Sequence, residues 1–415
     1  MFANAISDLE CVLCGKRYEP AEVNYTCPVC GPSGVLLVHY DYDRIAPHFT
    51  REQLAERRET TVWRYRALLP VSEECVAPPP LAIGGTPLYP VERLRAWLGM
   101  PHLWLKDDSR NPSASLKDRA SLIAILRADS RTVACASTGN AASSLAALAA
   151  AAGLPCVIFV PQNASRAKIV QLLMCGATVF AVQGNYDQAF DLCITACERF
   201  GWYNRNTGYN PYLVEGKKTV GLEIAEQLGW EPPETILVPS GDGCIISGVY
   251  RGFEDLLQLG LIERMPRLIA VQAAGSPALV RALEGAGVVH ACEAATIAEG
   301  ISVSLPRNGA MAVRCIRASG GFGVTVTDEE ILAAEKSLAR LTGVFAEPSA
   351  AASYAGLLCL LDEGRIARNE HVVLLVTGSG LKSIEAVAEV AGNVIPLAPD
   401  QRGLEIVAAR LHARS

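Results

Sequence analysis

Short apolar runs alternate with longer Ala- and Leu-rich segments from about residue 81 onward. Most runs are followed by a polar or glycine-rich turn and then by a segment of helical length. Repeated β–α alternation of this kind predicts parallel sheets with helices on both faces. The runs that we predict as strands are 102–106, 132–136, 155–160, 178–182, 235–239, 267–272 and 371–376.

The alternating region is too long for one sheet, since it extends over about 330 residues. We therefore expect an α/β fold with two parallel-sheet domains. The boundaries that we predict are 81–125 with 216–400 for a large domain, 126–215 for a small domain, and 401–415 for a C-terminal helix or tail.

Residues 45–80 carry a dense run of charges. The stretch FTREQLAERRETTVWRYRAL, residues 49–68, predicts one helix. The Pro-Pro-Pro run at 78–80 follows it and ends helical structure, because proline lacks a backbone N–H and clashes with the preceding turn. We expect this region to be a helical linker.

Two Cys-x-x-Cys pairs precede that region, and a glycine follows each pair. The glycine lets the backbone curl so that its amides face the thiolates. Four soft thiolates in two such pairs suit tetrahedral zinc. The pattern predicts a structural zinc ribbon over residues 1–44, held by Cys11, Cys14, Cys27 and Cys30. The alternatives are a chance cluster of buried cysteines and a redox pair.

The composition argues against several classes of protein. A net charge of −6 without a basic stripe gives no support for nucleic-acid binding. No apolar run reaches the roughly 18 residues of a membrane span, and the acidic N-terminus predicts no signal peptide. Ten of the fourteen cysteines lie singly in the chain, mostly in apolar segments. Buried free thiols behave in this way, so we expect a reducing, cytoplasmic setting.

One stretch, LWLKDDSRNPSASLKDRAS at residues 103–121, places Lys117 at a strand–loop–helix junction. An apolar run gives way to a polar Asn-Pro-Ser loop, and the loop opens into a helix whose first turn carries the lysine. We interpret Lys117 as a Schiff-base lysine for pyridoxal phosphate. A lysine at a helix start is usually a solvated surface charge, so other loops must supply the remaining cofactor contacts.

Three further loops follow predicted strands, at the edge where ligands of parallel sheets bind. Loop 137–140, Ser-Thr-Gly-Asn, opens an Ala-rich helix whose first amides favour an anion such as a substrate carboxylate. Loop 240–245, Ser-Gly-Asp-Gly-Cys-Ile, predicts an amide nest for a phosphate. Loop 377–380, Thr-Gly-Ser-Gly, brings a hydroxyl that can face a pyridine nitrogen. Each loop alone is also compatible with an ordinary helix cap or glycine turn.

Taken together, the motifs resemble the threonine synthase family of fold-type-II pyridoxal phosphate enzymes, relatives of tryptophan synthase β and threonine dehydratase. Their order is SLKDR, STGN, NPYLVEGKKT, SGDG, EPSAAA and TGSGLK, from about Gly84 to Lys382. The segment GGTPL at 84–88 is similar to the usual start of that fold. The cysteine pairs ahead of it also look like a ribbon found in some threonine synthases.

The resemblance implies a role for each matching residue. Lys117 matches the lysine that carries the cofactor and moves protons at the α and neighbouring carbons. Asn140 matches the residue that bonds the cofactor's 3′-oxygen, and Thr377 matches the partner of the pyridine nitrogen. The phosphate loop corresponds to Gly241, Asp242, Gly243, Cys244 and Ile245. The substrate is expected at Ser137, Thr138 and Asn140, with Asn206 of the polar crossover 204–220 as a further contact.

Three positions depart from the family pattern. The family often has Asn where Asp242 stands, and a carboxylate beside a phosphate is unfavourable, so we expect Asp242 to point away or to cap the helix. Ala141 stands where threonine synthases commonly have Thr, and Leu213 stands where they have a phosphate-binding Arg. Leucine cannot replace that clamp. Either another cation serves, or the substrate is not O-phosphohomoserine; the candidate cations are Arg205, Arg166, Lys217 and Lys106.

The implied reaction converts O-phospho-L-homoserine and water to L-threonine and phosphate, by γ-elimination and then addition at the β-carbon. The alternatives are a serine/threonine ammonia-lyase and a cysteate-synthase-like enzyme that uses phosphoserine and sulfite. A catalytically silent scaffold is a different class, against which the intact Lys117 and loops argue. We expect a homodimer that binds a small amino-acid substrate, with no membrane or nucleic-acid partner.

Overall fold

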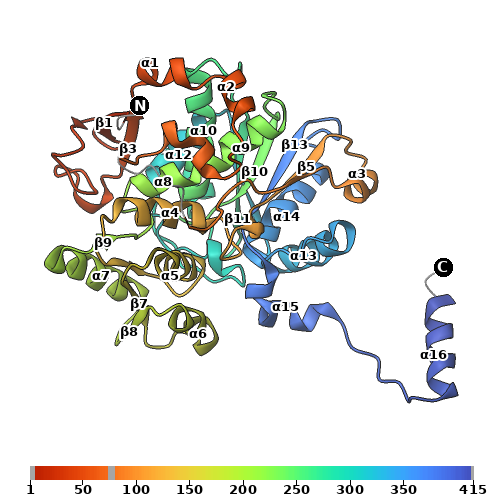
Figure 1. The fold of residues 1–415 in the computed structure, drawn as a ribbon. Helices are drawn as coiled ribbons and strands as arrows, with labels where there is room; N and C mark the ends of the chain where they lie inside the picture. Colours follow the sequence, from red (N-terminus) through yellow and green to blue (C-terminus); the bar gives the residue numbers. More distant parts are fainter. Residues whose placement is uncertain (1–4, 73–79, 413–415) are drawn as a thin grey trace.

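Three sheets organise the protein in the computed structural model, which describes residues 5–72 and 80–412 (Figure 1). The N-terminal sheet is antiparallel and has the order β2-β1-β3. Its strands are β1 (Ile6–Cys11), β2 (Arg17–Tyr18) and β3 (Leu36–Tyr40), with the 3-10 helix η1 (Gly31–Ser33) before β3.

The large sheet has the order β12-β11-β10-β13-β5-β4 and is parallel except for β4. Alternate residues of β10 enter different cores: Ile236 and Val238 belong to one apolar cluster, and Leu237 belongs to another. Both faces are therefore covered, as expected of a parallel sheet. The strands are β4 (Leu88–Tyr89), β5 (Leu103–Asp107), β10 (Thr235–Pro239), β11 (Arg267–Ala273), β12 (Phe322–Val326) and β13 (Val372–Val376).

The smaller sheet is parallel and has the order β8-β7-β6-β9. Its strands are β6 (Val133–Ala136), β7 (Cys156–Pro161), β8 (Thr178–Val182) and β9 (Tyr203–Asn204). Helix α5 (Asn140–Ala152) packs on one face of this sheet, and α7 (Tyr186–Phe200) packs on the other. Alanines let α5 pack closely, since Ala142, Ala146 and Ala149 are fully buried.

Most of the remaining helices cover the large sheet or extend from the two ends of the chain (Figure 1), whereas α6 packs beside α5 in the apolar cluster of the smaller sheet. The α-helices are α1 (Tyr42–Ile45), α2 (Arg51–Glu56), α3 (Glu92–Leu98), α4 (Lys117–Arg127), α6 (Arg166–Met174), α8 (Tyr212–Lys217), α9 (Thr219–Gln227), α10 (Cys244–Gln258), α11 (Ala278–Glu284), α12 (Gly309–Ala318), α13 (Asp328–Thr342), α14 (Pro348–Asp362), α15 (Ile384–Ala391) and α16 (Gln401–His412). The 3-10 helices are η2 (Ala46–His48), η3 (Val62–Leu68), η4 (Asp108–Arg110), η5 (Glu299–Ile301) and η6 (Gly380–Lys382).

All seven strands predicted from the apolar runs are present within a residue of their expected bounds, as β5, β6, β7, β8, β10, β11 and β13. Strand β12 was not predicted, because glycines interrupt its apolar pattern. Packing requires those glycines: a Cβ at Gly321 would overlap the carbonyl of Leu268, and one at Gly323 would meet Val280 at 2.8 Å.

The prediction of one helix over residues 49–68 is wrong. Helix α2 ends at Glu56, the chain is extended at Arg57, and η3 starts a new turn at Val62. The side chain of Arg64 replaces the missing helical hydrogen bonds, since its Nη1 donates to the carbonyls of Arg57 (2.8 Å) and Glu59 (3.1 Å). Side chains from residues 45–71 of the predicted linker region pack into the main core. Residues 73–79 of that region lie outside the described part of the chain.

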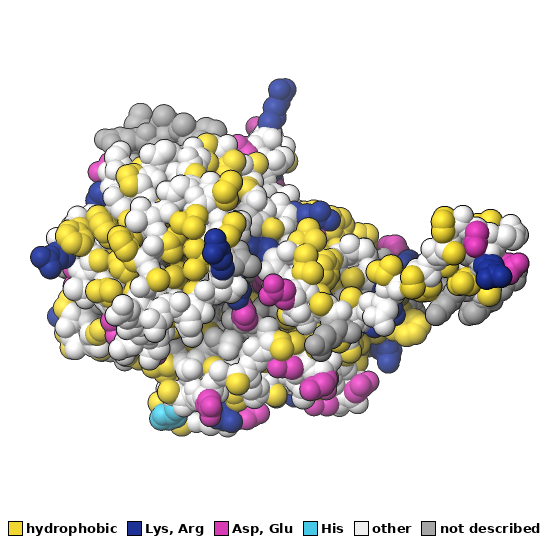
Figure 2. All heavy atoms as spheres, turned by 90° about the horizontal axis from the view of Figure 1, so that it is seen from below, with side chains coloured by type: hydrophobic (Ala, Val, Ile, Leu, Met, Phe, Trp, Pro, Cys, Tyr) yellow, Lys and Arg dark blue, Asp and Glu magenta, His cyan; other side chains and the backbone are white. Residues whose placement is uncertain are grey.

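The C-terminal arm, residues 392–412, projects from the body and ends in α16 (Figure 1). It exposes apolar side chains, including Val394 and Leu404. Yellow apolar side chains also spread over the face seen from below (Figure 2). Elsewhere in the chain, Met174 of α6 and Phe180 of β8 are exposed apolar side chains. Among the described residues, no helix combines the length and the apolar character needed to cross a membrane.

Candidate active site

Lys117 is the first residue of α4, at the carboxyl end of β5 in the large sheet. The loop before it pairs with the loop after β13: the Leu116 N–H donates to the carbonyl of Thr377 (2.9 Å), and the Ser379 N–H donates to that of Ala114 (3.1 Å). Two neighbouring parallel strands thus deliver Lys117 and Thr377 to one edge of the sheet. Burial, and then the nearby charge of Arg205, lower the pKa of Lys117.

Asn140 begins α5 and faces a carboxylate that the sequence analysis assigned no role. Its Nδ2 lies 2.9 Å from each carboxylate oxygen of Glu347, the residue before α14. A Cβ at Gly378 would meet that carboxylate at 2.5 Å, so glycine is required there. Burial raises the pKa of Glu347. The sequence signal that could have identified Glu347 was the EPSAAA motif, in which an acidic residue directly precedes an apolar helix that begins with proline.

The other residues of the loop at 137–140 organise their own turn. The hydroxyl of Ser137 accepts the Gly139 N–H (3.2 Å), and Ser137 and Thr138 are both partly exposed. Asn206 is buried, and its side-chain oxygen accepts the N–H of Ala136 (2.7 Å). It therefore fixes the end of β6, while its Nδ2 is one of the described buried atoms without a partner.

The predicted phosphate loop joins β10 to α10, and β10 lies directly beside β13, the strand that Thr377 follows. Gly243 has a φ of +83°, and a Cβ there would overlap Ala312. A Cβ at Gly241 would meet the backbone of Ile301 at 2.9 Å. Both glycines are thus required by close packing. They leave Cys244 and Ile245 at the first turn of α10, where the amides can face an anion.

Asp242 does not cap α10, which was one of the two expectations for it. Its Oδ1 accepts the N–H of Arg307 (3.2 Å), on a separate segment. Burial raises the pKa of Asp242. The carboxyl group is thus held by another backbone amide, which leaves the amides of α10 free.

Lys217 lies between α4 and α10 and has no hydrogen-bond partner among the described residues. Its side chain is fully buried. Two glycines allow α8, which carries Lys217, to pack closely against α4 and α10. A Cβ at Gly216 would overlap the carbonyl of Arg119, and one at Gly248 would meet the Lys217 Cβ at 2.8 Å. Burial lowers the pKa of Lys217 to about 8, with Arg205 and Lys117 acting in the same direction.

Arg205 is a second fully buried cation beside Lys117. Its guanidinium donates to the hydroxyls of Ser121 (3.0 Å) and Thr207 (3.0 Å) and to the carbonyl of Lys117 (3.4 Å). It pairs with no carboxylate in the part of the chain that the structure describes. A buried charge without a counter-ion is costly, so Arg205 and Lys217 indicate an anion-binding site. We call them the open pair.

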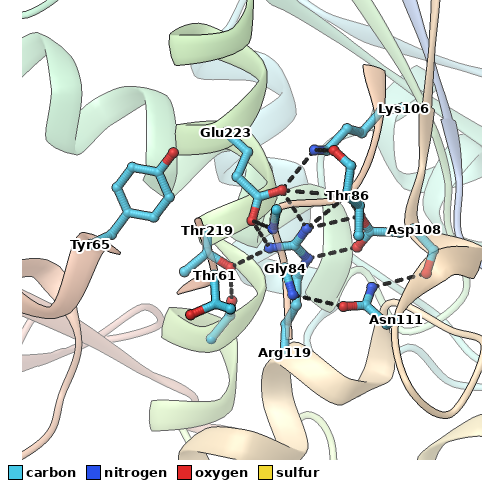
Figure 3. A network of polar contacts seen from close by, with 12 residues as sticks. Thr61, Tyr65, Gly84, Thr86, Lys106, Asp108, Asn111, Arg119, Thr219 and Glu223 are labelled. Atoms are coloured by element: carbon cyan, nitrogen blue, oxygen red, sulfur yellow. Dashed lines mark hydrogen bonds and ion pairs between the residues drawn. The ribbon is translucent and has the colours of Figure 1, made fainter. Parts of the chain in front are cut away.

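A different buried group surrounds Arg119, two residues after Lys117 (Figure 3). Arg119 contacts Asp108 (2.7 Å) and Glu223 (2.6 Å), and the Nζ of Lys106 contacts Glu223 (2.7 Å). We call these four residues the closed network, because two cations face two carboxylates. Lys106 is therefore not available for a substrate phosphate. Of the other candidate cations, Arg166 lies on the exposed N-terminus of α6.

The four cysteines of the N-terminal region converge, with their sulfur atoms all within 4.8 Å of one another. Gly15 and Gly31, which follow the pairs, have φ values of +70° and +65°. The tight turns allow the N–H of Gly15 to reach the carbonyl of Cys11 (2.8 Å) and that of Gly31 to reach Cys27 (2.9 Å). This cluster is built from N-terminal residues alone and is separate from the residues around Lys117.

Comparisons with known proteins agree with this architecture. The family model described as "Pyridoxal-phosphate dependent enzyme" matches residues 80–378. The processed form of threonine deaminase isoform 2 from Solanum lycopersicum has a similar fold, with a TM-score of 0.64 and 24% identity over 74% of this chain and 88% of that one. The fold and its loops thus define a pyridoxal-phosphate-dependent enzyme of fold type II.

Curated relatives narrow the class. A protein named threonine synthase from Methanosarcina acetivorans is 42% identical over 388 residues, which are 92% of this chain and 94% of that protein. Another of that name, from Methanocaldococcus jannaschii, is 38% identical over 407 residues, or 97% and 99% of the two chains. The chain belongs to the threonine synthase family.

Proposed function

We propose that this protein is a threonine synthase, which converts O-phospho-L-homoserine and water to L-threonine and phosphate. The observation that carries the proposal is the open pair, two buried cations beside Lys117 that have no carboxylate partner within the described part of the chain. A phosphate ester bound together with a phosphorylated cofactor brings two phosphate groups to one site. Curated relatives of 36–42% identity carry this name.

Pyridoxal phosphate fits the residues that are present. When bound, it withdraws electrons from the substrate's α-carbon. Lys117 would hold it covalently, Asn140 would face its 3′-oxygen, and Thr377 would face its ring nitrogen. Its phosphate would lie on the amides of Gly241, Asp242, Gly243, Cys244 and Ile245, in a loop whose two glycines leave no room for a side chain.

The missing arginine at Leu213 is consistent with this substrate. Leu213 is 1% exposed and packs in an apolar cluster with Leu122 and Val133, so this position does not present a charge to a ligand. Lys217 follows one helical turn later on the same face of α8. We infer that Lys217 and Arg205 replace the family's arginine as the phosphate-binding cations.

Proton transfer is assigned to Lys117. Its pKa is lowered by burial and by Arg205, so its amine gives up a proton more readily than an exposed lysine. When it is not bound to the cofactor, the Nζ of Lys117 would take the proton from the substrate's α-carbon and return protons to neighbouring carbons. Ser137, Thr138 and the first amides of α5 would hold the substrate carboxylate, with Asn206 fixing the loop's position.

The N-terminal region is proposed to be a structural zinc ribbon. Four thiolates in tetrahedral zinc sites are about 3.8 Å apart, given Zn–S bonds of about 2.3 Å. The sulfur atoms of Cys14 and Cys27 are 3.8 Å apart. Metal analysis of the purified protein should give one zinc per chain. A Cys14→Ser variant that keeps full metal content would contradict the assignment.

The test is a product balance. Purified enzyme given O-phosphohomoserine should release phosphate and threonine in equal amounts, and a Lys117→Ala variant should release neither. The ammonia-lyase alternative predicts no turnover of O-phosphohomoserine and 2-oxobutyrate from threonine. The cysteate-synthase-like alternative predicts cysteate from phosphoserine and sulfite. Either result would replace the proposed substrate while leaving the cofactor assignment intact.

We also propose a homodimer. The support is the exposed apolar surface on the C-terminal arm and the small domain, since large apolar patches commonly mark contacts between chains. Sedimentation equilibrium should give twice the chain's mass.

A further inference from the structure

The loop between the two cysteine pairs contacts the segment that carries Arg205. The hydroxyl of Tyr25 accepts the backbone N–H of Asn204 (3.3 Å). Its ring packs against Tyr203 and Tyr209, with centroid distances of 6.0 and 5.5 Å. A side chain two residues before Cys27 is thus inserted beside the candidate active site.

This contact occupies the open edge of a sheet. Strand β9 lies at the end of the smaller sheet and pairs only with β6. On the β6 side, the N–H of Arg205 donates to the carbonyl of Ala134 (2.8 Å). On the outer side, Tyr25 satisfies the N–H of Asn204, which an edge strand otherwise leaves unpaired. The backbone from Asn204 to Arg205 is therefore held from both sides.

The same N-terminal region also contacts α8, which carries Lys217. Val35 and Leu37 share an apolar cluster with Val214. The ring of Tyr40 lies 3.9 Å from the Nζ of Lys218, measured to the ring centroid. The N-terminal region therefore touches residues near both members of the open pair.

We propose that Tyr25 is a positioning residue of the active site: by holding Asn204, it keeps the guanidinium of Arg205 directed at a bound phosphate group. The N-terminal cysteine region thereby serves anion binding as well as stability. The identity of the substrate in this inference rests on the proposed function. The presence of an anion site does not. The chemistry recognised is a phosphate dianion, free or as an ester.

The test measures phosphate binding by the cofactor-loaded enzyme and compares Tyr25→Phe with the parent. Loss of one neutral hydrogen bond should weaken the Kd for inorganic phosphate about 3- to 10-fold, as measured by calorimetry. The KM for O-phosphohomoserine should rise by the same factor, while kcat changes less than about twofold. Zinc content and Tm should match those of the parent.

Arg314→Gln is the matched control. Arg314 is half exposed, and its guanidinium contacts Glu10 of the N-terminal sheet (2.9 Å). This variant therefore removes a contact of the N-terminal region that does not involve the segment of Arg205. Its phosphate affinity should equal that of the parent. Tyr209→Leu removes the opposing ring and leaves the N-terminal region intact. It should reproduce the loss, and it replaces Tyr25→Phe if that variant fails to fold.

The inference would be overturned by a Kd for phosphate within twofold of the parent in both tyrosine variants, or by an equal loss in Arg314→Gln. A parent enzyme that binds no inorganic phosphate would also reject it. If the parent does not convert O-phosphohomoserine but Tyr25→Phe still weakens phosphate binding, the proposed function fails and the positioning role stands.

Discussion

The closed network and the open pair are both fully buried at the start of α4, yet their charges are organised in opposite ways. In the closed network, Arg119 and Lys106 face Asp108 and Glu223 (Figure 3), and the N–H of Gly85 also donates to Glu223. In the open pair, Arg205 and Lys217 face hydroxyls and a carbonyl, or no described acceptor at all.

The pKa values show what each arrangement does. Burial alone would raise the pKa of Glu223, but Arg119 and Lys106 lower it to about 2, so the carboxylate stays charged and paired. Burial lowers the pKa of Lys217 to about 8. A paired cluster stabilises the fold around Lys117, whereas an unpaired one costs stability until an anion binds. The two clusters are similarly buried, so the pairing of their charges is what distinguishes a structural site from a binding site.

Lys117→Ala should produce the largest effect, since it removes the residue between the two clusters. We expect kcat to fall by more than about 1000-fold, because the group that holds the cofactor and transfers protons is lost. The free energy of unfolding should stay near that of the parent. Steady-state kinetics and urea denaturation measure the two quantities. A variant with a tenth of the parent's kcat would exclude Lys117 as the central residue.

Arg119→Met should break the closed network and lower the free energy of unfolding by about 3–5 kcal/mol, because Asp108 and Glu223 are left as unpaired buried charges. Urea denaturation measures this change in the free energy of unfolding. Arg365→Met is the control, since Arg365 and Glu363 form a pair that is nearly half exposed, worth about 0–1 kcal/mol. Equal losses in the two variants would show that the network is no more stabilising than a surface pair.

Lys217→Met should have the opposite effect to Arg119→Met: it should weaken phosphate binding without lowering the free energy of unfolding. Phosphate affinity should fall about 10- to 100-fold through the loss of a charged partner, while the free energy of unfolding stays equal or rises, because an unpaired buried cation is removed. Calorimetric titration and urea denaturation test both. If this variant is destabilised as strongly as Arg119→Met, the distinction between open and closed clusters is wrong.

The pH dependence should show the smallest effect. Lys217 is charged below about pH 8, so phosphate should bind less tightly as pH rises through 8, and Lys217→Met should lack that step. The free energy of unfolding should change in the opposite direction and rise as the pH rises. The folded state binds fewer protons than the unfolded state between pH 8 and about 10.4, so the cost of the buried charge is relieved across this range. Titrations from pH 7 to 9 test the binding step, in which Cys244, Arg205, Lys117 and Asp242 also face Lys217.

Local pattern was enough to predict much of this protein. Apolar runs of strand length located seven strands, because a buried parallel strand must be apolar on both faces. Turn chemistry located the loops at 137–140, 240–245 and 377–380, because glycine and short polar residues are needed where a strand passes into a helix. The spacing of the cysteine pairs predicted their convergence.

The tertiary structure alone decided which charges are paired. Lys106, Lys217 and Arg205 were equal candidates in the sequence, yet Lys106 meets a carboxylate 117 residues away and the other two meet none among the described residues. Glu347 reaches Asn140 across 207 residues, and Tyr25 reaches Asn204 across 179. Spacing along a chain specifies periodicity and turns, but burial and counter-ions depend on which distant segments pack together. The chemistry of this site therefore follows from the packing of α4, α8 and α10.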